Sequence, residues 1–138
     1  MEKESIPYFC EDLNSYLKTM FKYKKNYSHA IDATICAYSK KFDIYLRWNG
    51  VYYSTKFPKN LTIARIGFYK ERKGYGKALL CFLIECSSKY QFDYIVIEAT
   101  NEKSASFAHK FGFQKIDDED GRNFVIAIND LRIIMSSM

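Results

Sequence analysis

A short apolar run, Ile95-Val96-Ile97, stands between two segments of helical character and constrains the fold more than any other feature. A strand that is apolar at nearly every position is typical of a sheet covered on both faces, beside parallel neighbours. Residues 76–89, before the run, have a broad apolar surface at helical spacing, and a helix is expected at 102–111 after it. This alternation predicts an α/β arrangement with residues 94–99 as a central strand.

Shorter elements complete the pattern on the N-terminal side. Apolar residues at helical spacing predict an amphipathic first helix at 7–23, and strands are expected at 33–38 and 61–67. Two β-rich runs, 42–48 and 51–56, flank Asn49-Gly50, a dipeptide that tolerates the positive φ angles of a type I′ turn. The sequence therefore predicts a hairpin over these two runs.

Two further strands are expected at the C-terminal side, at about 113–116 and 123–128, joined by the acidic turn 117–121. The predicted order is a helix, three or four antiparallel strands, and then β, α, β, α, β, β. No repeat, low-complexity tract or Pro/Gly-rich linker divides the 138 residues, so a single domain is expected over 1–138. The expected fold class is α/β with α+β mixing, in which a mixed sheet has antiparallel N-terminal strands and flanking helices.

Composition limits the surroundings in which such a domain works. Aromatic residues make up 17% of the chain, which favours an aromatic-rich core over disorder. No apolar run approaches the roughly 20 residues needed to cross a bilayer, and residues 1–7 are too charged for a signal peptide, so a cytoplasmic location without membrane contact is expected. The four cysteines form no Cys-x-x-Cys and no zinc-site spacing, so reduced thiols and no metal are expected.

The net charge of +5 is weak support for an anionic partner, and most of the basic excess lies before residue 60. Lys22, Lys24 and Lys25 follow the first helix, where cations complement the negative end of the helix dipole. A second basic cluster surrounds two glycines and contains Lys70, Arg72, Lys73 and Lys77. Nucleic acid stays open as a partner on these grounds.

The two glycines, Gly74 and Gly76, lie between a predicted strand and a predicted helix. Without a Cβ the backbone can bend tightly and present consecutive N–H groups to an anion, and the helix N-terminus adds unpaired amides and partial positive charge. A phosphate-binding turn and a plain tight turn both fit Gly-x-Gly alone. The P-loop pattern is absent, and Leu79 stands where a dinucleotide fold would need a third glycine.

The loop Glu71-Arg72-Lys73-Gly74-Tyr75-Gly76 resembles the coenzyme signature Gln/Arg-x-x-Gly-x-Gly/Ala of the GNAT superfamily of acyl-CoA N-acyltransferases. Glu71 departs from that pattern, and Arg72 could restore the positive charge. The segment 101–113 is similar to a second family pattern, Asn-x-x-Ala-x-x-Leu/Phe-Tyr-x-Lys/Arg-x-Gly-Phe, through Asn101, Phe107, Lys110, Gly112 and Phe113, with Ser104 as the small residue. Capping by Asn101 and a helix stop at Gly112 would explain two of these positions without the family.

The resemblance implies a GNAT-like sheet splayed between the strand that ends near Gly67 and the strand 94–99, with the pantothenate arm of acetyl-CoA in the gap. The implied coenzyme-binding residues are Ile66, Gly67, Phe68, Arg72, Lys73, Gly74, Tyr75, Gly76, Lys77, Asn101, Ser104 and Phe107. The implied reaction is direct attack of an amine on the thioester of acetyl-CoA, the cosubstrate. Holding the two reactants together would supply most of the rate enhancement.

The resemblance is incomplete at the groups that move protons. Ala108 replaces the family tyrosine that serves as acid, so an empty position beside the sulfur is expected, and Ala108→Tyr is expected to raise kcat. His109 points about 100° around the helix from residue 108 and is expected at the surface. Glu98 is the candidate catalytic base, and Asp43 has a poorer claim.

Three functions stay open on the sequence alone. The first is an N-acetyltransferase acting on an amine of a small molecule or a protein. The second is a binding or regulatory module that keeps the coenzyme fold without turnover, and the third is an acetyltransferase acting on aminoacyl-tRNA. The acidic turn 117–120 is expected either to be a solvated turn or to attract a cationic acceptor. The oligomeric state, a homodimer included, is left open.

Overall fold

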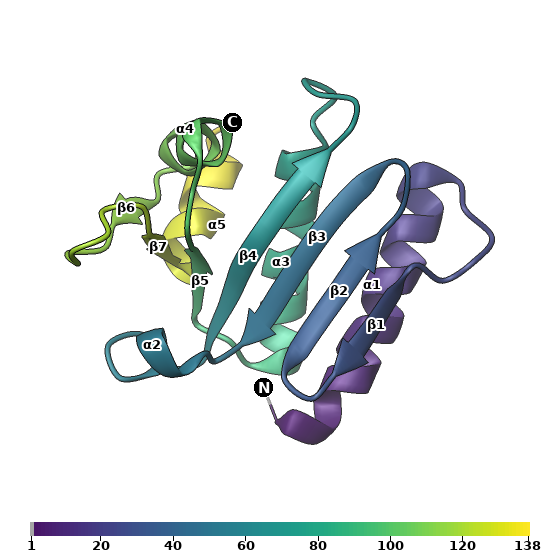
Figure 1. The fold of residues 1–138 in the computed structure, drawn as a ribbon, viewed down its shortest axis with the longest axis horizontal. Helices are drawn as coiled ribbons and strands as arrows, with labels where there is room; N and C mark the ends of the chain where they lie inside the picture. Colours follow the sequence, from purple (N-terminus) through teal and green to yellow (C-terminus); the bar gives the residue numbers. More distant parts are fainter. Residues whose placement is uncertain (1) are drawn as a thin grey trace.

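One seven-stranded sheet runs through the structure, a computed structural model that describes residues 2–138 (Figure 1). The strand order is β1-β2-β3-β4-β5-β7-β6, and every pairing is antiparallel except that between β4 and β5. The strands are β1 (Ser28–Ile31), β2 (Thr34–Tyr38), β3 (Phe42–Trp48), β4 (Asn60–Phe68), β5 (Tyr94–Ile97), β6 (Gln114–Lys115) and β7 (Phe124–Ala127). The helices are a short 3₁₀ turn (Lys3–Ser5), α1 (Ile6–Phe21), α2 (Val51–Ser54), α3 (Tyr75–Tyr90), α4 (Glu102–Lys110) and α5 (Ile128–Ser136).

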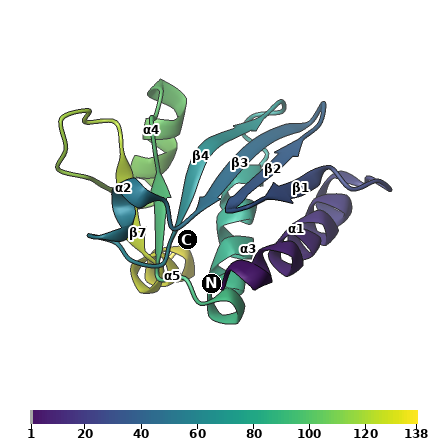
Figure 2. The same ribbon diagram turned by 60° about the horizontal axis from the view of Figure 1, so that its bottom comes forward.

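Helices α1 and α3 cover one face of strands β1 to β4 and leave the other face open (Figure 2). In α1 the apolar residues Phe9, Leu13, Leu17 and Phe21 recur every four residues, so they share one helix face, and all are buried against the sheet. The helix ends at Lys22, whose backbone has a left-handed φ of 59°. The core therefore lies between these two helices and the sheet.

The parallel pairing of β4 with β5 extends over only four positions, from Asn60 opposite Tyr94 to Ile63 opposite Ile97. Beyond Ile63, strand β4 pairs with β3 alone. In the pairing with β3, Ile63 and Arg65 have consecutive partners, so Ala64 forms a β-bulge. This bulge lies where β4 and β5 separate. The splayed sheet expected from the sequence is confirmed, and the splay opens at the end of β4 that leads to the glycines.

The predicted hairpin over 42–48 and 51–56 is wrong in its second strand. Residues 42–48 form β3, but their partner is β4, and residues 51–54 form the short helix α2. Asn49 closes the loop, since its N–H donates to the carbonyl of Asn60 at 2.8 Å and its side-chain oxygen accepts from Lys59 N–H at 3.0 Å. The Asn49-Gly50 dipeptide therefore begins a ten-residue connection that contains α2, rather than a two-residue hairpin turn.

Besides the 3₁₀ turn at Lys3–Ser5, one strand and one helix were not predicted. Strand β1 pairs with β2 through the two-residue turn Asp32-Ala33, where Asp32 has a left-handed φ of 51°. Helix α5 follows β7 directly and buries Ile128 and Leu131. The other predicted elements are present with ends shifted by one or two residues, and β6 is shorter than predicted.

Candidate functional site

The candidate coenzyme site begins where the sheet parts. The last backbone bond between the two strands runs from the Glu98 N–H to the Ile63 carbonyl, at 3.1 Å. The residues expected to contact the pantothenate arm, Ile66, Gly67 and Phe68, follow on the freed half of β4. The Phe68 ring packs against Phe21 of α1, with centroids 6.1 Å apart. Only the backbone of this segment is therefore free to bind a ligand through polar groups.

The glycine loop turns from β4 into α3 in a conformation that suits an anion. Gly74 is the N-cap of α3 with a left-handed φ of 77°, and a Cβ added there would meet no atom within 4 Å. Within residues 2–138, no side chain hydrogen-bonds to the first amides of this 16-residue helix. Arg72, Lys73 and Gly74 are exposed, and Lys77 is half-buried. Unpaired amides, open space and positive charge thus coincide at one point, as a pyrophosphate would require.

Gly76 has a different role from Gly74, because its neighbour is protein. A Cβ at position 76 would lie 2.5 Å from Cε1 of Phe107, so the glycine lets α4 approach the start of α3. The Tyr75 ring faces the core, 4.7 Å from the ring of Phe21. Of the sequence-predicted loop residues, Gly76 can therefore offer only main-chain groups, and the ring of Tyr75 is held by core packing.

Helix α4 brings the second motif up against the glycine loop. Phe107 lies over Gly76, and Lys103 forms an ion pair with Glu71. Asn101 and Ser104 form a capping box, in which each side chain accepts the backbone N–H of the other, at 3.0 and 2.9 Å. Capping therefore explains these two side chains without a ligand. A coenzyme contact from them stays a prediction.

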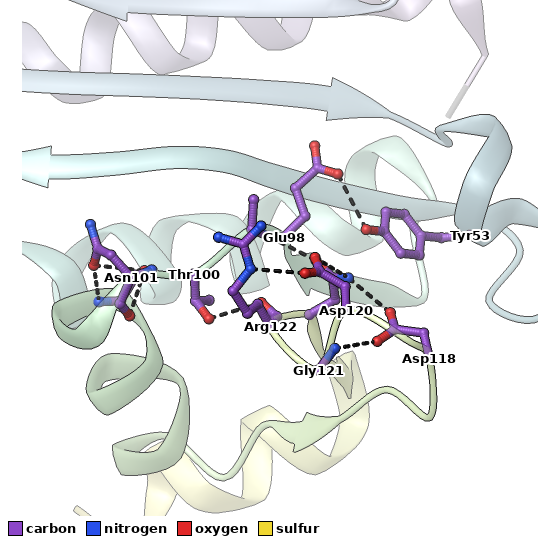
Figure 3. A network of polar contacts seen from close by, with 11 residues as sticks. Tyr53, Glu98, Thr100, Asn101, Asp118, Asp120, Gly121 and Arg122 are labelled. Atoms are coloured by element: carbon purple, nitrogen blue, oxygen red, sulfur yellow. Dashed lines mark hydrogen bonds and ion pairs between the residues drawn. The ribbon is translucent and has the colours of Figure 1, made fainter.

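Glu98 stands at the base of the splay in a cluster that joins three segments. Its Oε1 is 2.5 Å from Nη1 of Arg47 on β3, and its Oε2 accepts a hydrogen bond of 3.2 Å from the Tyr53 hydroxyl on α2 (Figure 3). The Glu98 side chain keeps 15% of its surface exposed. Burial raises the pKa of Tyr53, and the nearby carboxylate of Glu98 raises it further, so this phenol stays protonated across the ordinary pH range.

Sequence reasoning named Glu98 but missed Arg47 and Tyr53. No local pattern links positions 47, 53 and 98, and the segment that carries Tyr53 was predicted to be a strand. The alternative candidate base, Asp43, forms an ion pair with Arg65 at 3.0 Å on the open face of the sheet. Of the two candidate bases, Glu98 is therefore the one that lies where β4 and β5 separate, and its partners are Arg47 and Tyr53.

The acidic turn between β6 and β7 is held to the end of β5. The Ala99 N–H donates to Asn123 Oδ1 at 2.7 Å, and the Asn123 amide in turn donates to Asp118 Oδ2 at 2.8 Å. This hydrogen bond and one from the Gly121 N–H lower the pKa of Asp118. Asp120 pairs with Arg122 at 2.9 Å. Two of the four acidic side chains therefore shape the turn.

Ala108 does not leave the vacant position that the sequence analysis expects. Its side chain has no exposed surface and belongs to the hydrophobic core. A tyrosine at this position would have to displace packed neighbours, because protein cores hold few voids. His109, one position along, is exposed, as expected, and its ring lies 5.1 Å from that of Phe124.

No protein-family model matches the chain, and no curated protein matches it. Solved structures do. The KacTA–DNA complex superposes with a TM-score of 0.57 at 18% identity, over 93% of this chain and 86% of the other. A structure of FdhC, described as a nucleotide-linked sugar GNAT, gives 0.53 at 15% identity over 99% and 89%. The AtaT–AtaR complex with acetyl-CoA gives 0.54 at 15% identity over 73% and 69%.

The chain has the GNAT fold. The superpositions, together with the splayed sheet and the glycine turn after its fourth strand, support this assignment, and identities below 25% limit it to the fold. Both sequence motifs lie on the elements where the GNAT resemblance predicts them: residues 71–76 at the junction of β4 and α3, and residues 101–113 on α4 and the turn after it. Over residues 2–138, no helix is long and apolar enough to span a membrane.

Proposed function

We propose that this protein is an N-acetyltransferase that transfers the acetyl group of acetyl-CoA to an amine. The observation that carries the proposal is the exposed turn at Gly74, which opens the N-terminus of α3 directly beyond the unpaired half of β4. A ligand with a pyrophosphate and an extended amide-containing arm matches this combination. Arg72, Lys73 and Lys77 would add charge attraction for the phosphates, and the backbone of residues 66–68 would bind the arm.

Acetyl-CoA, when bound, supplies a thioester carbonyl, and the residues of the chain supply position and proton transfer. Glu98 lies at the base of the splay and can accept the proton that the amine nitrogen loses as it attacks the thioester carbonyl, directly or through water. Arg47 forms an ion pair with Glu98 and holds the carboxylate in place. The Tyr53 phenol donates to the same carboxylate and limits its rotation.

A second candidate function is favoured by one observation. Both carboxylate oxygens of Glu98 already have partners, the Arg47 guanidinium and the Tyr53 hydroxyl. A module that binds coenzyme without turnover could have the same arrangement, with Glu98 in a structural role. Release of free thiol from acetyl-CoA in the presence of amines, together with the mass gain of the acceptor, separates the two functions. A binding module binds coenzyme A and releases no thiol.

The site assignment is tested most sharply at Gly74. Asp and Asn tolerate the left-handed backbone better than other side chains, have nearly the same shape and meet open space here, so they differ mainly in charge. We expect Gly74→Asp to weaken coenzyme A binding by about tenfold or more relative to Gly74→Asn, because it places an anion where the pyrophosphate is expected. Calorimetric titration measures both, with circular dichroism as the check on folding.

Equal affinities of the Asp and Asn variants would contradict the assignment. Gly76→Asp is the less informative variant, although the motif suggests it first. Its Cβ would collide with Phe107, so a loss of binding could follow from displacement of α4 alone.

A further inference from the structure

A cavity of about 290 Å³ lies between α2 and the turn that joins β6 to β7. Tyr53 belongs both to its wall and to the hydrogen bond with Glu98, and Asn123 belongs both to its wall and to the bond with the Ala99 N–H. The cavity therefore adjoins the candidate base. Its main walls are Tyr52, Tyr53 and Phe57 from the α2 segment and Ile116, Asp117 and Asp118 from the turn.

The polar groups of this cavity are largely committed to one another. Both carboxylate oxygens of Asp118 accept hydrogen bonds, from the Gly121 N–H and from the Asn123 amide, at 2.9 and 2.8 Å. Besides Asp118, the exposed charged residues in the lining are Lys56 and Asp117, which have opposite signs. The cavity thus offers neither a free pair of carboxylates for a second ammonium group nor a cationic cluster for a phosphate.

What the cavity does offer is aromatic surface. Tyr52 is 89% exposed, the most of any large apolar side chain described. Phe57 is half-buried and is held edge-on against Tyr94, with ring centroids 5.4 Å apart. Aromatic rings that line a concave site recognise other planar groups by stacking and edge contacts.

We propose that this cavity receives the non-reacting half of the acceptor amine and that this half is an aromatic ring. The proposal rests on the proposed acetyltransferase function, whose acceptor class it names. A ring held beside Tyr52 and Phe57 would direct an amine on a short arm toward Glu98. In the transfer, the amine nitrogen forms a bond to the acetyl carbon, the carbon–sulfur bond breaks, the thiolate leaves, and the ammonium proton passes to Glu98 or to water.

The test compares three amines of similar length: 2-phenylethylamine, butylamine and 1,4-diaminobutane. Each is titrated by NMR into the protein saturated with coenzyme A, and each is assayed for thiol release with acetyl-CoA. The variant is Tyr52→Ala, and the matched control is Tyr8→Ala, since Tyr8 is 62% exposed on α1. We expect 2-phenylethylamine to be favoured over butylamine by about tenfold and Tyr52→Ala to remove that preference while Tyr8→Ala retains it.

The two readouts separate the two proposals. Binding of 2-phenylethylamine that depends on Tyr52, without thiol release from any amine, would support the aromatic cavity and overturn the transferase function. Thiol release with no preference for the aromatic amine, or with a preference that survives Tyr52→Ala, would support the function and overturn the cavity. Preference for 1,4-diaminobutane would overturn the aromatic class in favour of a cationic one.

Discussion

Glu71 is the only acidic side chain between β4 and α3, and it stands beside the turn expected to hold a pyrophosphate. Its ion pair with Lys103 lowers its pKa, so it is ionised at neutral pH and also engages a cation that lies close to the site. We expect Glu71→Gln to tighten coenzyme A binding by about threefold, because it removes an anion and frees Lys103. Calorimetric titration at low and high salt measures the change.

The matched control is Glu85→Gln, an exposed position on α3 beyond the first turn that changes the net charge equally. The gain at Glu71 should shrink at high salt, since screening weakens exposed charges. An equal gain from both variants would mean that only the overall charge matters. A loss at Glu71→Gln would mean that Glu71 itself organises the loop.

The burial of Ala108 predicts an effect of Ala108→Tyr opposite to the one that the family pattern suggests. Because its side chain is fully buried, we expect Ala108→Tyr to lower the free energy of unfolding by about 1–3 kcal/mol through overpacking rather than to raise kcat. Ser106→Tyr, an exposed position on the same helix, is the control for the change in helix propensity. Urea unfolding of both variants measures the difference. An Ala108→Tyr variant with unchanged stability and a higher kcat would contradict this prediction and support an empty general-acid position at residue 108.

Helix α2 has four residues and too little length to persist alone, yet it places a phenol on Glu98. We expect Tyr53→Phe to keep the ring packing and to lower kcat by about tenfold, because the charged Glu98 carboxylate loses the hydrogen bond that the phenol donates to it. The KM for acetyl-CoA should stay unchanged. Steady-state kinetics across pH measures this, with Tyr8→Phe as the control. Equal pH–rate profiles and kcat values for wild type and Tyr53→Phe would mean that the Tyr53 hydroxyl has no part in the reaction and that only its ring packing matters.

The long elements of this fold could be predicted because their pattern repeats. Helices α1, α3 and α4 and strands β3, β4 and β5 each place apolar residues with the spacing of the structure they adopt. Helix α5 could have been found in the same way, since Ile128, Leu131, Ile134 and Met135 share one face. Strand β1 has only four residues and one buried position, so it offered little signal.

The remaining errors arise where distant contacts outweigh local preference. Residues 51–54 have β-favouring side chains, but packing of Phe57 against Tyr94 and closure of the loop by Asn49 keep them out of the sheet. The candidate site divides in the same way. The Gly74 turn is local and was predictable, whereas the pairing of Glu98 with Arg47 and Tyr53 depends on the tertiary fold.

For the molecule as a whole, buried groups that must ionise set the alkaline limit of stability. Burial raises the pKa of the Cys86 thiol from its usual value near 9 to about 12, and burial raises the pKa of Tyr16 and Tyr90 to about 12. Each contribution is fully present below the pKa of the unfolded chain and is lost as pH rises toward the folded value. We expect the urea midpoint to fall steadily above pH 9.

Cys86→Ala separates the thiol from the phenols. Its urea midpoint should be lower at pH 8, because a buried side chain is truncated, but should fall less between pH 8 and 10.5. Cys81→Ala, at an exposed position on the same helix, should fall nearly as much as the wild type, because burial is a larger cause of the raised Tyr16 pKa than Cys81 is. A Cys86→Ala variant as steep as the wild type would exclude the thiol as a source of the alkaline loss.

The short ladder between β4 and β5 leaves a strand edge in the middle of the sheet. From Ala64 to Phe68, alternate backbone groups point away from β3 with no strand beside them, and such edges can recruit strands of other chains. The bulge at Ala64 and the exposed charge of Arg65 are features that discourage this kind of pairing. A coenzyme lying along the edge would complete the protection, so scarcity of that ligand would expose the protein to aggregation as well as to inactivity.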